Sequence, residues 1–514
     1  MSDFLDAICR QAAARPRALA FFNASGQQLT YAQLEAQANS LASFLLSNMP
    51  AKKPVALIGH KEPEMLVGMV ACMKAGHPYV PLDSSLPEQR IRGILEQLGD
   101  PLVVGVGART FDGLPGRTLD RTALASILAS PTAAPDASHA ISGEDAHYIL
   151  FTSGSTGAPK GVVQPARSMD CTYRYFSRFI PEGEQLVFFN RAHYSFDLSI
   201  FDLAIALPFG HTLFALTEAV EESLATSFAA LHEADPALWV STPSYLDMCL
   251  VDPAFSPELL PSLKTVVVCG ETLHNSTAMK LLDRFPGIAL YNTYGPTETQ
   301  GAVTDVLITR EIAERPEALP VGRVSPFDQL WLADPNTGER ITRCASDAPG
   351  EVIIAGGTVA SGYFARPDLT EASFGVVRDD AGNTIPYYRT GDEGYLDEDG
   401  MLHFLGRLDL QVKVNGYRIE LEEIEEALKK TDEVSFACVV PVTRHGTNVA
   451  LAAHVVVRAG IEESRQTTKL LKEKLKETLP AYMIPRTFVY HDALPVNANG
   501  KTDRKALAAE GKAQ

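Results

Sequence analysis

Several features that define other classes of protein are missing from this sequence of 514 residues. Its seven cysteines are scattered, odd in number and without a CxxC pair, which argues against a disulfide framework or zinc site and favours a cytoplasmic protein. No apolar run is long enough to span a membrane, and the N-terminal residues, with Asp3 and Asp6, lack the apolar core of a secretory signal. Positive charge is in the minority, and the formal net charge of −18 argues against nucleic-acid binding and attachment to anionic membranes.

The composition is that of a soluble globular protein, with 46% hydrophobic and 21% charged residues, and the length suggests more than one domain. Residues 30–46 carry apolar side chains at helical spacing, and VALIG (55–59) and YVPLD (79–83) are candidates for buried strands. Because strands and helices alternate over roughly the first 300 residues, we expect parallel sheets with helices on their faces.

After about residue 320, the alternation of strands and helices gives way to short strand candidates separated by tight turns. Asp397–Gly400 has the acidic start of a calcium loop, but the later ligand positions are missing, so we expect a hairpin turn. The final hundred or so residues combine helices at 420–430 and 467–478 with strands at 435–442 and 449–457. This mixture predicts a small α+β domain at the C-terminus.

A strand-like run at Tyr148–Phe151 leads into a loop of Thr, Ser and Gly that ends at Lys160. Glycine lets a backbone turn tightly and approach a ligand closely, and amides, hydroxyls and a lysine together suit a polyphosphate. The spacing is not that of P-loop ATPases, because Lys160 is followed by Gly161, and a flexible linker is the alternative interpretation. The predicted phosphate-binding residues are Thr152, Ser153, Gly154, Ser155, Thr156, Gly157 and Lys160.

Polar or glycine residues also lie where four other strand candidates end: VFFN (187–190), the strand that opens ALWVSTPSYLDM (237–248), TVVVCGE (265–271), and the strand-like stretch that precedes YNTYGPTET (291–299). In open α/β sheets, ligands bind at the carboxyl ends of the strands. We therefore expect these four strand ends to face one crevice.

Ten sequence motifs follow one another along the chain. They are LTYAQL (29–34), KAGHPYVPLD (74–83), FTSGSTGAPKGV (151–162), FDLS (196–199), NTYGPTE (292–298), GEVIIAGGTVASGY (350–363), YRTGDEGY (388–395), GRLDLQVKVNGYRIELEEIE (406–425), LPAYMIP (479–485) and NGKTDRKAL (499–507). In this order they resemble the motifs of the adenylate-forming superfamily, specifically the amino-acid adenylation domains of non-ribosomal peptide synthesis. Within that group the sequence is most similar to the free-standing D-alanine–carrier protein ligases.

The resemblance implies both a fold and a two-step reaction. The fold is a large N-terminal domain over 1–408, made of two α/β subdomains and a small β-barrel-like subdomain, and a mobile α+β domain over 409–514. ATP first activates a carboxylate as an acyl-adenylate with release of pyrophosphate, and the acyl group then passes to a phosphopantetheine thiol. A carboxylate and a triphosphate repel each other, so Mg²⁺ and a lysine are expected at the site.

The resemblance assigns Glu298 and Thr152 to catalysis and to binding of Mg²⁺, and Lys501 to the bridge between substrate carboxylate and nucleotide. Asp392 would accept the ribose hydroxyls, and Tyr294 would stack on adenine. Taken alone, Lys501 could be a solvated lysine, Asp392 a turn residue and Tyr294 a core aromatic. The remaining residues assigned to ATP or AMP are Gly270, Glu271, Asn292, Thr293, Gly295 and Arg407.

Asp197 decides the substrate class, because the aspartate of FDxS pairs with the substrate ammonium in the enzymes that this sequence resembles. An unpaired carboxylate in a closed pocket is costly, so acids without an amine should be rejected. The alternative is a helix N-cap aspartate. The other residues assigned to substrate binding are Phe196 as a gate, Leu198, Phe201, Ser241, Val267, Cys269, Thr293, Gly301 and Ala302.

Three of these positions bear on D-alanine as the substrate. Cys269 matches the D-alanine ligases, although a small buried thiol at a strand end is an equally physical interpretation. Gly301 replaces the usual valine and enlarges the pocket, while Phe201 replaces a smaller apolar residue and could refill it. The open alternatives are another amino acid used in specialised metabolism, an acyl- or aryl-CoA ligase, which Asp197 argues against, and a non-catalytic amino-acid-binding relative.

The resemblance also assigns parts of the C-terminal region. Asp409 matches the hinge between the domains, with an ordinary turn residue as the alternative, and Lys413–Gly416 would meet the incoming pantetheine. No carrier segment follows Lys501, so we expect a separate carrier protein as partner. The basic stretch Lys469–Lys476 is a candidate docking surface, although a solvated helix face is the simpler interpretation.

Overall fold

The structure is a computed structural model that describes residues 1–49, 52–109, 111–154, 158–343, 345–379, 381–444, 447–495 and 502–510. The chain forms two compact units, each described by itself. The large unit comprises Met1–Ser84, Leu98–Leu150 and Gly161–Gly406, and the small unit comprises Ser85–Gln97, Phe151–Lys160 and Arg407–Gln514. The functional division at residues 408 and 409 stays a prediction.

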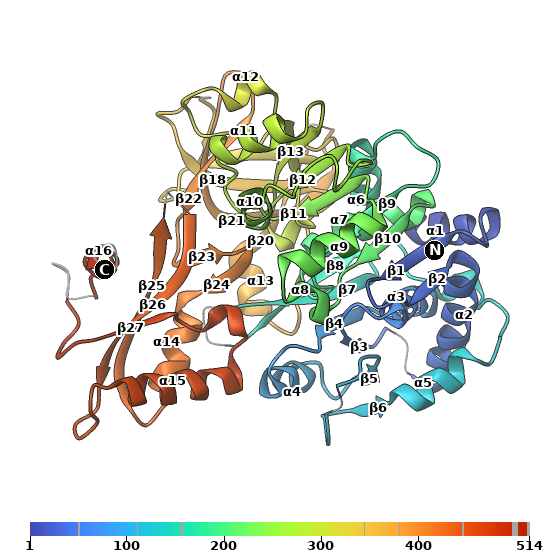
Figure 1. The fold of residues 1–514 in the computed structure, drawn as a ribbon, viewed down its shortest axis with the longest axis horizontal. Coiled ribbons are helices and arrows are strands. Elements are labelled where there is room, and N and C mark those ends of the chain that lie inside the picture. The colour runs from blue at the N-terminus through green and yellow to red at the C-terminus, as the bar shows by residue number, and fades with distance from the viewer. Residues whose placement is uncertain are drawn as a thin grey trace. The chain divides into compact units, whose positions relative to one another are not determined.

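The large unit contains a nine-stranded sheet in the order β15-β14-β13-β12-β11-β9-β10-β1-β2. Strands β9 to β13 are parallel neighbours, so their carboxyl ends lie along one edge (Figure 1). The strands are β1 (Leu19–Asn23), β2 (Gln28–Thr30), β9 (Val187–Asn190), β10 (Thr212–Ala215), β11 (Leu238–Ser241), β12 (Thr265–Val268), β13 (Ala289–Tyr294), β14 (Thr304–Leu307) and β15 (Arg323–Val324).

A second sheet of seven strands has the order β19-β8-β7-β4-β3-β5-β6. Its inner strands are parallel, and the predicted strands 55–59 and 79–83 are two of them, which confirms both. The strands are β3 (Val55–Gly59), β4 (Tyr79–Asp83), β5 (Leu102–Gly105), β6 (Arg117–Leu119), β7 (Ala146–Thr152), β8 (Lys160–Pro165) and β19 (Gly362–Tyr363).

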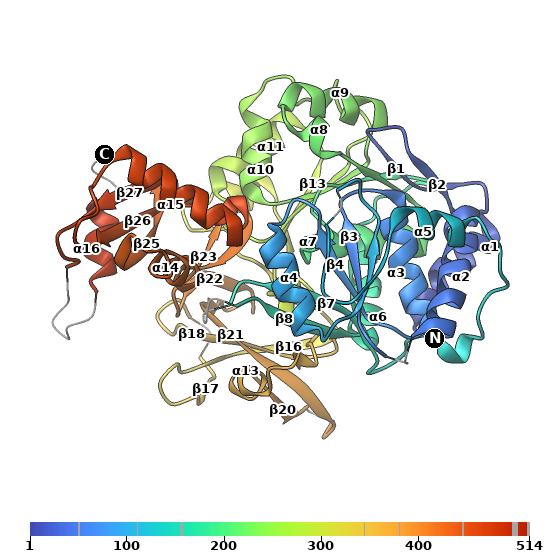
Figure 2. The same cartoon turned by 90° about the horizontal axis from the view of Figure 1, so that it is seen from below.

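Helices cover the faces of both sheets, as the alternating pattern predicts. Helix α2 (Tyr31–Asn48) buries the apolar stripe of residues 30–46, begins with a capping box at Thr30 and packs against α3 and α5 (Figure 2). The other helices of the large unit are α1 (Asp3–Ala14), α3 (Pro63–Ala75), α5 (Arg121–Leu128), α6 (Ala166–Phe176), α7 (Leu198–Ala206), α8 (Glu218–Glu221), α9 (Leu224–Ala234), α10 (Pro243–Val251), α11 (Asn275–Arg284), α12 (Arg310–Ala313) and α13 (Pro367–Ser373).

A third sheet of the large unit is antiparallel and stands where the β-barrel-like subdomain is expected. Asp397 and Gly400 form the turn between its last two strands, where the Gly400 N–H donates to the Asp397 carbonyl at 2.9 Å. The predicted hairpin is therefore confirmed. The strands are β16 (Asp328–Ala333), β17 (Arg340–Ile341), β18 (Gly350–Gly356), β20 (Phe374–Arg378), β21 (Thr384–Leu396) and β22 (Leu402–Arg407).

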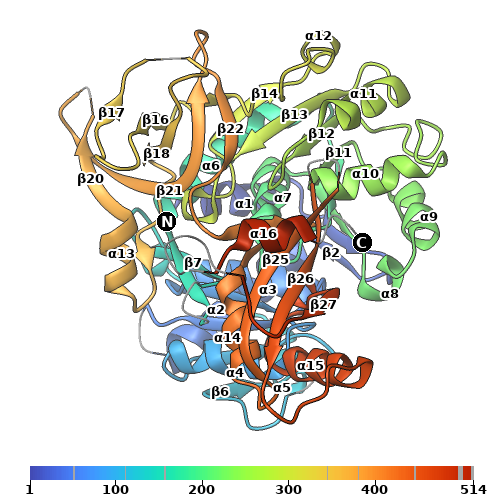
Figure 3. The same ribbon diagram turned by 90° about the vertical axis from the view of Figure 1, so that its left-hand side faces the viewer.

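The small unit contains the predicted α+β domain (Figure 3). Helix α14 packs on β25 and on α15, and its inward side chains share a core with Leu471 and Leu475 of α15. The elements are β23 (Gln411–Val414), β24 (Tyr417–Glu420), β25 (Val434–Arg444), β26 (Thr447–Val457), β27 (Thr487–Tyr490), α4 (Glu88–Gln97), α14 (Leu421–Lys429), α15 (Arg465–Thr478) and α16 (Arg504–Glu510). Within the described residues, no helix has the length and apolar character needed to cross a bilayer.

His147 lies in the core of the large unit, on β7, and makes stability depend on pH. The rings of Phe4, Tyr79 and Tyr148 surround it, and neither ring nitrogen has a hydrogen-bond partner among the described residues. Burial lowers the pKa of His147 to about 3, from 6.5. Between about pH 3 and pH 6.5, His147 binds a proton in the unfolded chain but not in the folded chain. The free energy of unfolding is therefore not reduced by His147 above pH 6.5, and it decreases as the pH falls below that value.

Replacement of His147 by phenylalanine is expected to remove this pH dependence. The histidine costs about 2 kcal/mol of stability at pH 5 relative to neutral pH. Melting temperatures of the wild type should therefore fall more steeply between pH 7 and pH 5 than those of His147→Phe. Removal of the exposed His139 should leave the wild-type slope unchanged. Equal slopes for wild type and His147→Phe would contradict the assignment.

Candidate active site

The four strand ends predicted to face a crevice belong to β9, β11, β12 and β13, which lie side by side in one sheet. Asn190, Ser241 and Asn292 lie at or near these ends, and all three are buried. This is the edge where a doubly wound sheet binds its ligands.

Asp197 lies between β9 and α7 and holds a hydrogen bond with a residue of a distant motif. The Thr297 hydroxyl donates to Asp197 Oδ2 at 2.6 Å, although the two residues are 100 positions apart. Asp197 occupies the N-cap position of α7 but makes no side-chain capping bond, so capping does not explain this aspartate. Gly301 is its neighbour, since a Cβ built on Gly301 would lie 3.6 Å from Asp197 Cγ.

Glu298 is fully buried, one residue after Thr297. The Tyr363 hydroxyl donates to Glu298 Oε1 at 2.7 Å, and the Ala360 N–H donates to the Glu298 carbonyl at 2.9 Å. Both partners come from the GTVASGY stretch, so two of the sequence motifs meet here. This geometry fixes the Glu298 carboxylate in one position.

The residues assigned to adenine and ribose are in contact with each other. The Tyr294 hydroxyl donates to Asp392 Oδ2 at 2.6 Å, and both residues are buried. Asn292 donates from Nδ2 to the Pro320 carbonyl at 2.8 Å, while its Oδ1 is buried without a partner among the described residues. A buried acceptor without a donor is costly, and the exocyclic amine of adenine would satisfy it.

Small residues surround the side of the site next to Asp197. The Cys269 thiol donates to the Gly301 carbonyl at 3.2 Å. A Cβ on Gly295 would lie 2.7 Å from the Cα of Ala302, so only glycine fits where these two backbones meet. The aromatic ring of Phe201 is fully buried and stacks on Phe176 at 3.9 Å.

The other residues assigned to the pocket and its surroundings belong to the same unit. Thr293 donates from Oγ1 to the Val268 carbonyl at 2.9 Å, and Ser241 Oγ accepts from Trp239 Nε1 at 2.8 Å. Glu271 accepts from the Ser244 N–H at 3.1 Å. Buried among these positions are Ser241, Val267, Cys269, Thr293, Gly301 and Ala302, whereas Phe196, Leu198, Gly270 and Glu271 are half-buried.

The described part of the phosphate loop belongs to the small unit. Ser153 Oγ donates to the Arg418 carbonyl at 2.9 Å, and the Gly154 N–H donates to Glu423 Oε2 at 3.3 Å. Thr152 Oγ1 is buried without a partner among the described residues, so it is available to a ligand. Lys160 is half-buried at the end of the loop, while Ser155, Thr156, Gly157 and Lys501 lie outside the described residues.

The hinge and the pantetheine loop also lie in the small unit. Asp409 pairs with Arg407, whose Nε lies 2.9 Å from Asp409 Oδ1. Burial raises the pKa of Asp409, but the hydrogen bonds and charge of Arg407 outweigh it and leave that pKa below its usual value. Lys413 lies on β23, and Gly416 has a φ of 83° in the turn to β24. The roles of these residues stay predictions.

Sequence reasoning missed a set of residues that hold the segment before Asp197. The buried amine of Lys61 donates to Asn190 Oδ1 at 2.6 Å and to the Ala192 carbonyl at 2.5 Å. Burial lowers the pKa of Lys61 to about 8. Burial also raises the pKa of Asp202, which accepts from Asn190 Nδ2 at 2.8 Å, to about 8. The available signal was the position of Lys61 two residues after a buried strand, which ends at Gly59.

The arrangement of the sheets and the contacts between distant motifs at Glu298 and at Tyr294–Asp392 agree with an adenylate-forming enzyme. Two family models match the chain: the AMP-binding enzyme model over residues 8–364 and the AMP-binding enzyme C-terminal domain model over residues 423–501. The chain therefore belongs to the AMP-binding enzyme family, whose members use ATP and form adenylates.

Relatives and solved structures agree with this membership. The chain is 38% identical to the D-alanine–D-alanyl carrier protein ligases of Bacillus cereus (strain B4264), over 98% of this chain and 99% of that one, and of Bacillus mycoides (strain KBAB4), over 94% of each. It superposes on PA1221, an NRPS protein containing adenylation and PCP domains, with a TM-score of 0.83, 25% identity and coverage of 99% and 84%. The Vibrio cholerae adenylation domain AlmE, with glycyl-adenosine-5'-phosphate, shares the fold at a TM-score of 0.82, 22% identity and coverage of 100% and 98%.

Proposed function

We propose that this protein is an amino acid–carrier protein ligase that prefers D-alanine. It activates the amino acid as an aminoacyl-adenylate and transfers it to the phosphopantetheine thiol of a separate carrier protein. The observation that carries the proposal is the carboxylate of Asp197, oriented by Thr297 beside Gly301. The similarity to D-alanine–D-alanyl carrier protein ligases over almost the whole chain supports the choice of substrate and partner.

Asp197 selects for an amine. Asp197 is half-buried, and a partly desolvated carboxylate is stabilised when a cation pairs with it; the ammonium group of an amino acid would supply that cation. Gly301 lies next to it, the Cys269 thiol contacts Gly301, and Ala302 follows Gly301 in the chain; these small residues suit a short substrate side chain such as methyl. A propionate or an aromatic acid would leave the carboxylate of Asp197 without its cation.

The residues assigned to the nucleotide carry polar groups of the kinds that ATP and Mg²⁺ bind. Among the described residues, the buried Asn292 Oδ1 has no donor and would accept from the adenine amine, and the buried Thr152 hydroxyl has no partner. The resemblance in sequence assigns Glu298 and Thr152 to Mg²⁺, and each offers oxygen, the ligand that this ion prefers: Glu298 a carboxylate oriented by Tyr363, and Thr152 a hydroxyl. When bound, Mg²⁺ neutralises charge on the phosphates.

The chain's own residues then orient two displacements. In the first, an oxygen of the amino acid carboxylate attacks the α-phosphorus, and the bond to pyrophosphate breaks. Asp197 holds the ammonium group, and Lys501 offsets the charge that the two anions bring together. In the second, the carrier thiolate attacks the acyl carbon, and AMP leaves with the pair of electrons of the acyl–oxygen bond.

Exchange of labelled pyrophosphate into ATP tests the substrate assignment. We expect D-alanine to support the highest kcat/KM, with glycine and L-alanine lower and larger D-amino acids lower still. Propionate, which matches D-alanine except for the amine, should be at least about 100-fold poorer because a charged pair in the site is lost. Comparable exchange with propionate would contradict the role of Asp197, and no exchange with any substrate would contradict the enzyme activity.

A second candidate function is activation of a larger amino acid. Gly301 favours it, because the missing side chain leaves room for a larger substrate. The φ of Gly301 is 81°, which makes any residue larger than glycine unfavourable at this position. The same exchange panel separates the two, since a larger substrate would exceed D-alanine in kcat/KM.

A further inference from the structure

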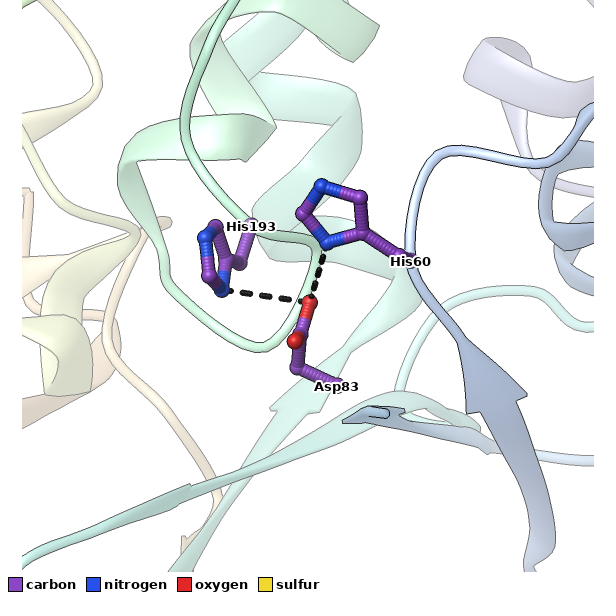
Figure 4. A group of neighbouring side chains, drawn as sticks. All are labelled: His60, Asp83 and His193. Carbon is purple, nitrogen blue, oxygen red and sulfur yellow. Dashed lines mark hydrogen bonds and ion pairs between the residues drawn. The ribbon is translucent and has the colours of Figure 1, made fainter. Parts of the chain in front are cut away.

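A second cluster of ionisable side chains lies outside the residues assigned to nucleotide and amino acid. His60 follows β3, Asp83 ends β4 and His193 follows β9, so three separate segments of the large unit converge (Figure 4). His60 Nδ1 lies 2.9 Å and His193 Nδ1 lies 3.1 Å from the same oxygen, Oδ2 of Asp83. The two imidazole rings meet edge to face at 4.9 Å.

The arrangement places three metal-binding atoms around one point. One ligand atom from each of the three residues lies within 4.8 Å of the other two. Ligand atoms that lie about 2.0–2.2 Å from one tetrahedral metal ion are about 3.3–3.6 Å apart. The two nitrogen–oxygen distances are shorter than that, so the side chains would have to move apart slightly to admit an ion.

We propose that His60, Asp83 and His193 form a binding site for a divalent transition-metal ion of the zinc type. Two imidazole nitrogens and one carboxylate suit Zn²⁺ or Co²⁺, whereas Mg²⁺ prefers oxygen ligands. The site therefore differs in chemistry from the Mg²⁺ that accompanies ATP. His60 and Asp83 are buried, but the His193 side chain is 23% exposed, which gives an ion access and leaves a coordination position for water.

The position of His193 links this site to the amino acid pocket, and this link rests on the proposed function. The His193 carbonyl accepts from the Phe196 N–H at 2.9 Å, and the rings of His193 and Phe196 lie 5.9 Å apart. Phe196 immediately precedes Asp197 in the sequence. Lys61, next to His60, already holds the same segment through Asn190 and Ala192. A bound ion would add a second attachment and restrict the position of the Asp197 carboxylate.

Metal titration of the purified full-length protein tests the site. The protein carries no polyhistidine tag, is stripped with a chelator and is kept in excess Mg²⁺. Calorimetric titration with Zn²⁺ should show one equivalent bound, and Co²⁺ should give visible absorption of a nitrogen- and oxygen-ligated ion without a thiolate band. His193→Ala should weaken binding by about 100-fold or more, because it removes one of three ligands.

Two further variants serve as comparisons. His139→Ala removes an exposed histidine from the same unit and should bind Zn²⁺ as the wild type does. His60→Ala should lose binding as His193→Ala does, and circular dichroism of each stripped variant confirms that it is folded. Equal affinity of the wild type and His193→Ala, or no binding by the folded wild type, would overturn the proposal and leave the cluster as a hydrogen-bonded anchor.

Activity supplies a separate readout of the link. Zn²⁺ should lower the KM for D-alanine in the wild type, leave kcat almost unchanged, and have no effect on His193→Ala. If the metal binds and the KM does not change, the link to the pocket is refuted while the site stands. If no amino acid supports exchange, the proposed function fails, whereas the titration still reports on the metal site.

Discussion

Replacement of Asp197 by alanine is expected to lower kcat/KM for the amino acid by about 10²- to 10³-fold, since breaking a desolvated ion pair costs roughly 3–4 kcal/mol. The loss should fall on the amino acid rather than on ATP. Asp197 accepts from Thr297 and lies beside Gly301, whereas Tyr294 and Asp392, which we assign to the nucleotide, contact each other. Pyrophosphate exchange at varied amino acid and ATP concentrations measures both parameters.

Two measurements make this result specific. Asp283→Ala removes an exposed carboxylate from the same unit and should behave as the wild type does. Binding of ATP to Asp197→Ala, measured by calorimetry, should stay within about twofold of the wild-type value. Unchanged use of D-alanine by Asp197→Ala, or an equal loss with propionate as substrate, would contradict the ammonium assignment.

Replacement of Lys501 by alanine is expected to abolish adenylation while sparing transfer from preformed aminoacyl-adenylate. The lysine offsets the repulsion between carboxylate and triphosphate, which amounts to about 4 kcal/mol for two unit charges at 4 Å and an effective dielectric of 20. That repulsion exists only in the first half-reaction, so a loss of about 10³-fold should be confined to pyrophosphate exchange. The second half-reaction is measured by adding preformed aminoacyl-adenylate and carrier protein that bears phosphopantetheine with a free thiol.

The matched comparison is Lys505→Ala, because Lys505 is an exposed lysine four residues further along. This variant should retain both half-reactions. An equal loss of both half-reactions in Lys501→Ala would show that the residue supports the fold of the small unit or the docking of the carrier, and would remove it from the adenylation step.

Local patterns were enough to predict most of the fold. Four predicted features depend only on residues close together in sequence, and each is confirmed. They are the apolar stripe of residues 30–46, the strands at 55–59 and 79–83, and the hairpin at Asp397–Gly400. The alternation of strands and helices also predicted the parallel edge formed by β9 to β13. These features depend on periodicity and turn chemistry, which a single sequence displays.

Contacts between distant motifs could not be predicted in this way. Nothing near Asp197 in sequence indicates Thr297, and nothing near Glu298 indicates Tyr363, because these hydrogen bonds depend on how the strands are ordered. The cluster of His60, Asp83 and His193 joins the ends of strands from two different sheets for the same reason. Sequence motifs identified the candidate residues, and strand order decides which of them are partners.

The hydrogen bond between Tyr294 and Asp392 has a consequence for nucleotide affinity. Because the phenol is tethered, the face of its ring is fixed before any base arrives, and little rotational freedom of that ring remains to be lost on stacking. If Asp392 accepts the ribose hydroxyls as we assign it to do, the ribose would meet a carboxylate that already accepts one hydrogen bond. Under that assignment, we expect selectivity among nucleosides to depend on how well each sugar fits a preorganised tyrosine–aspartate pair.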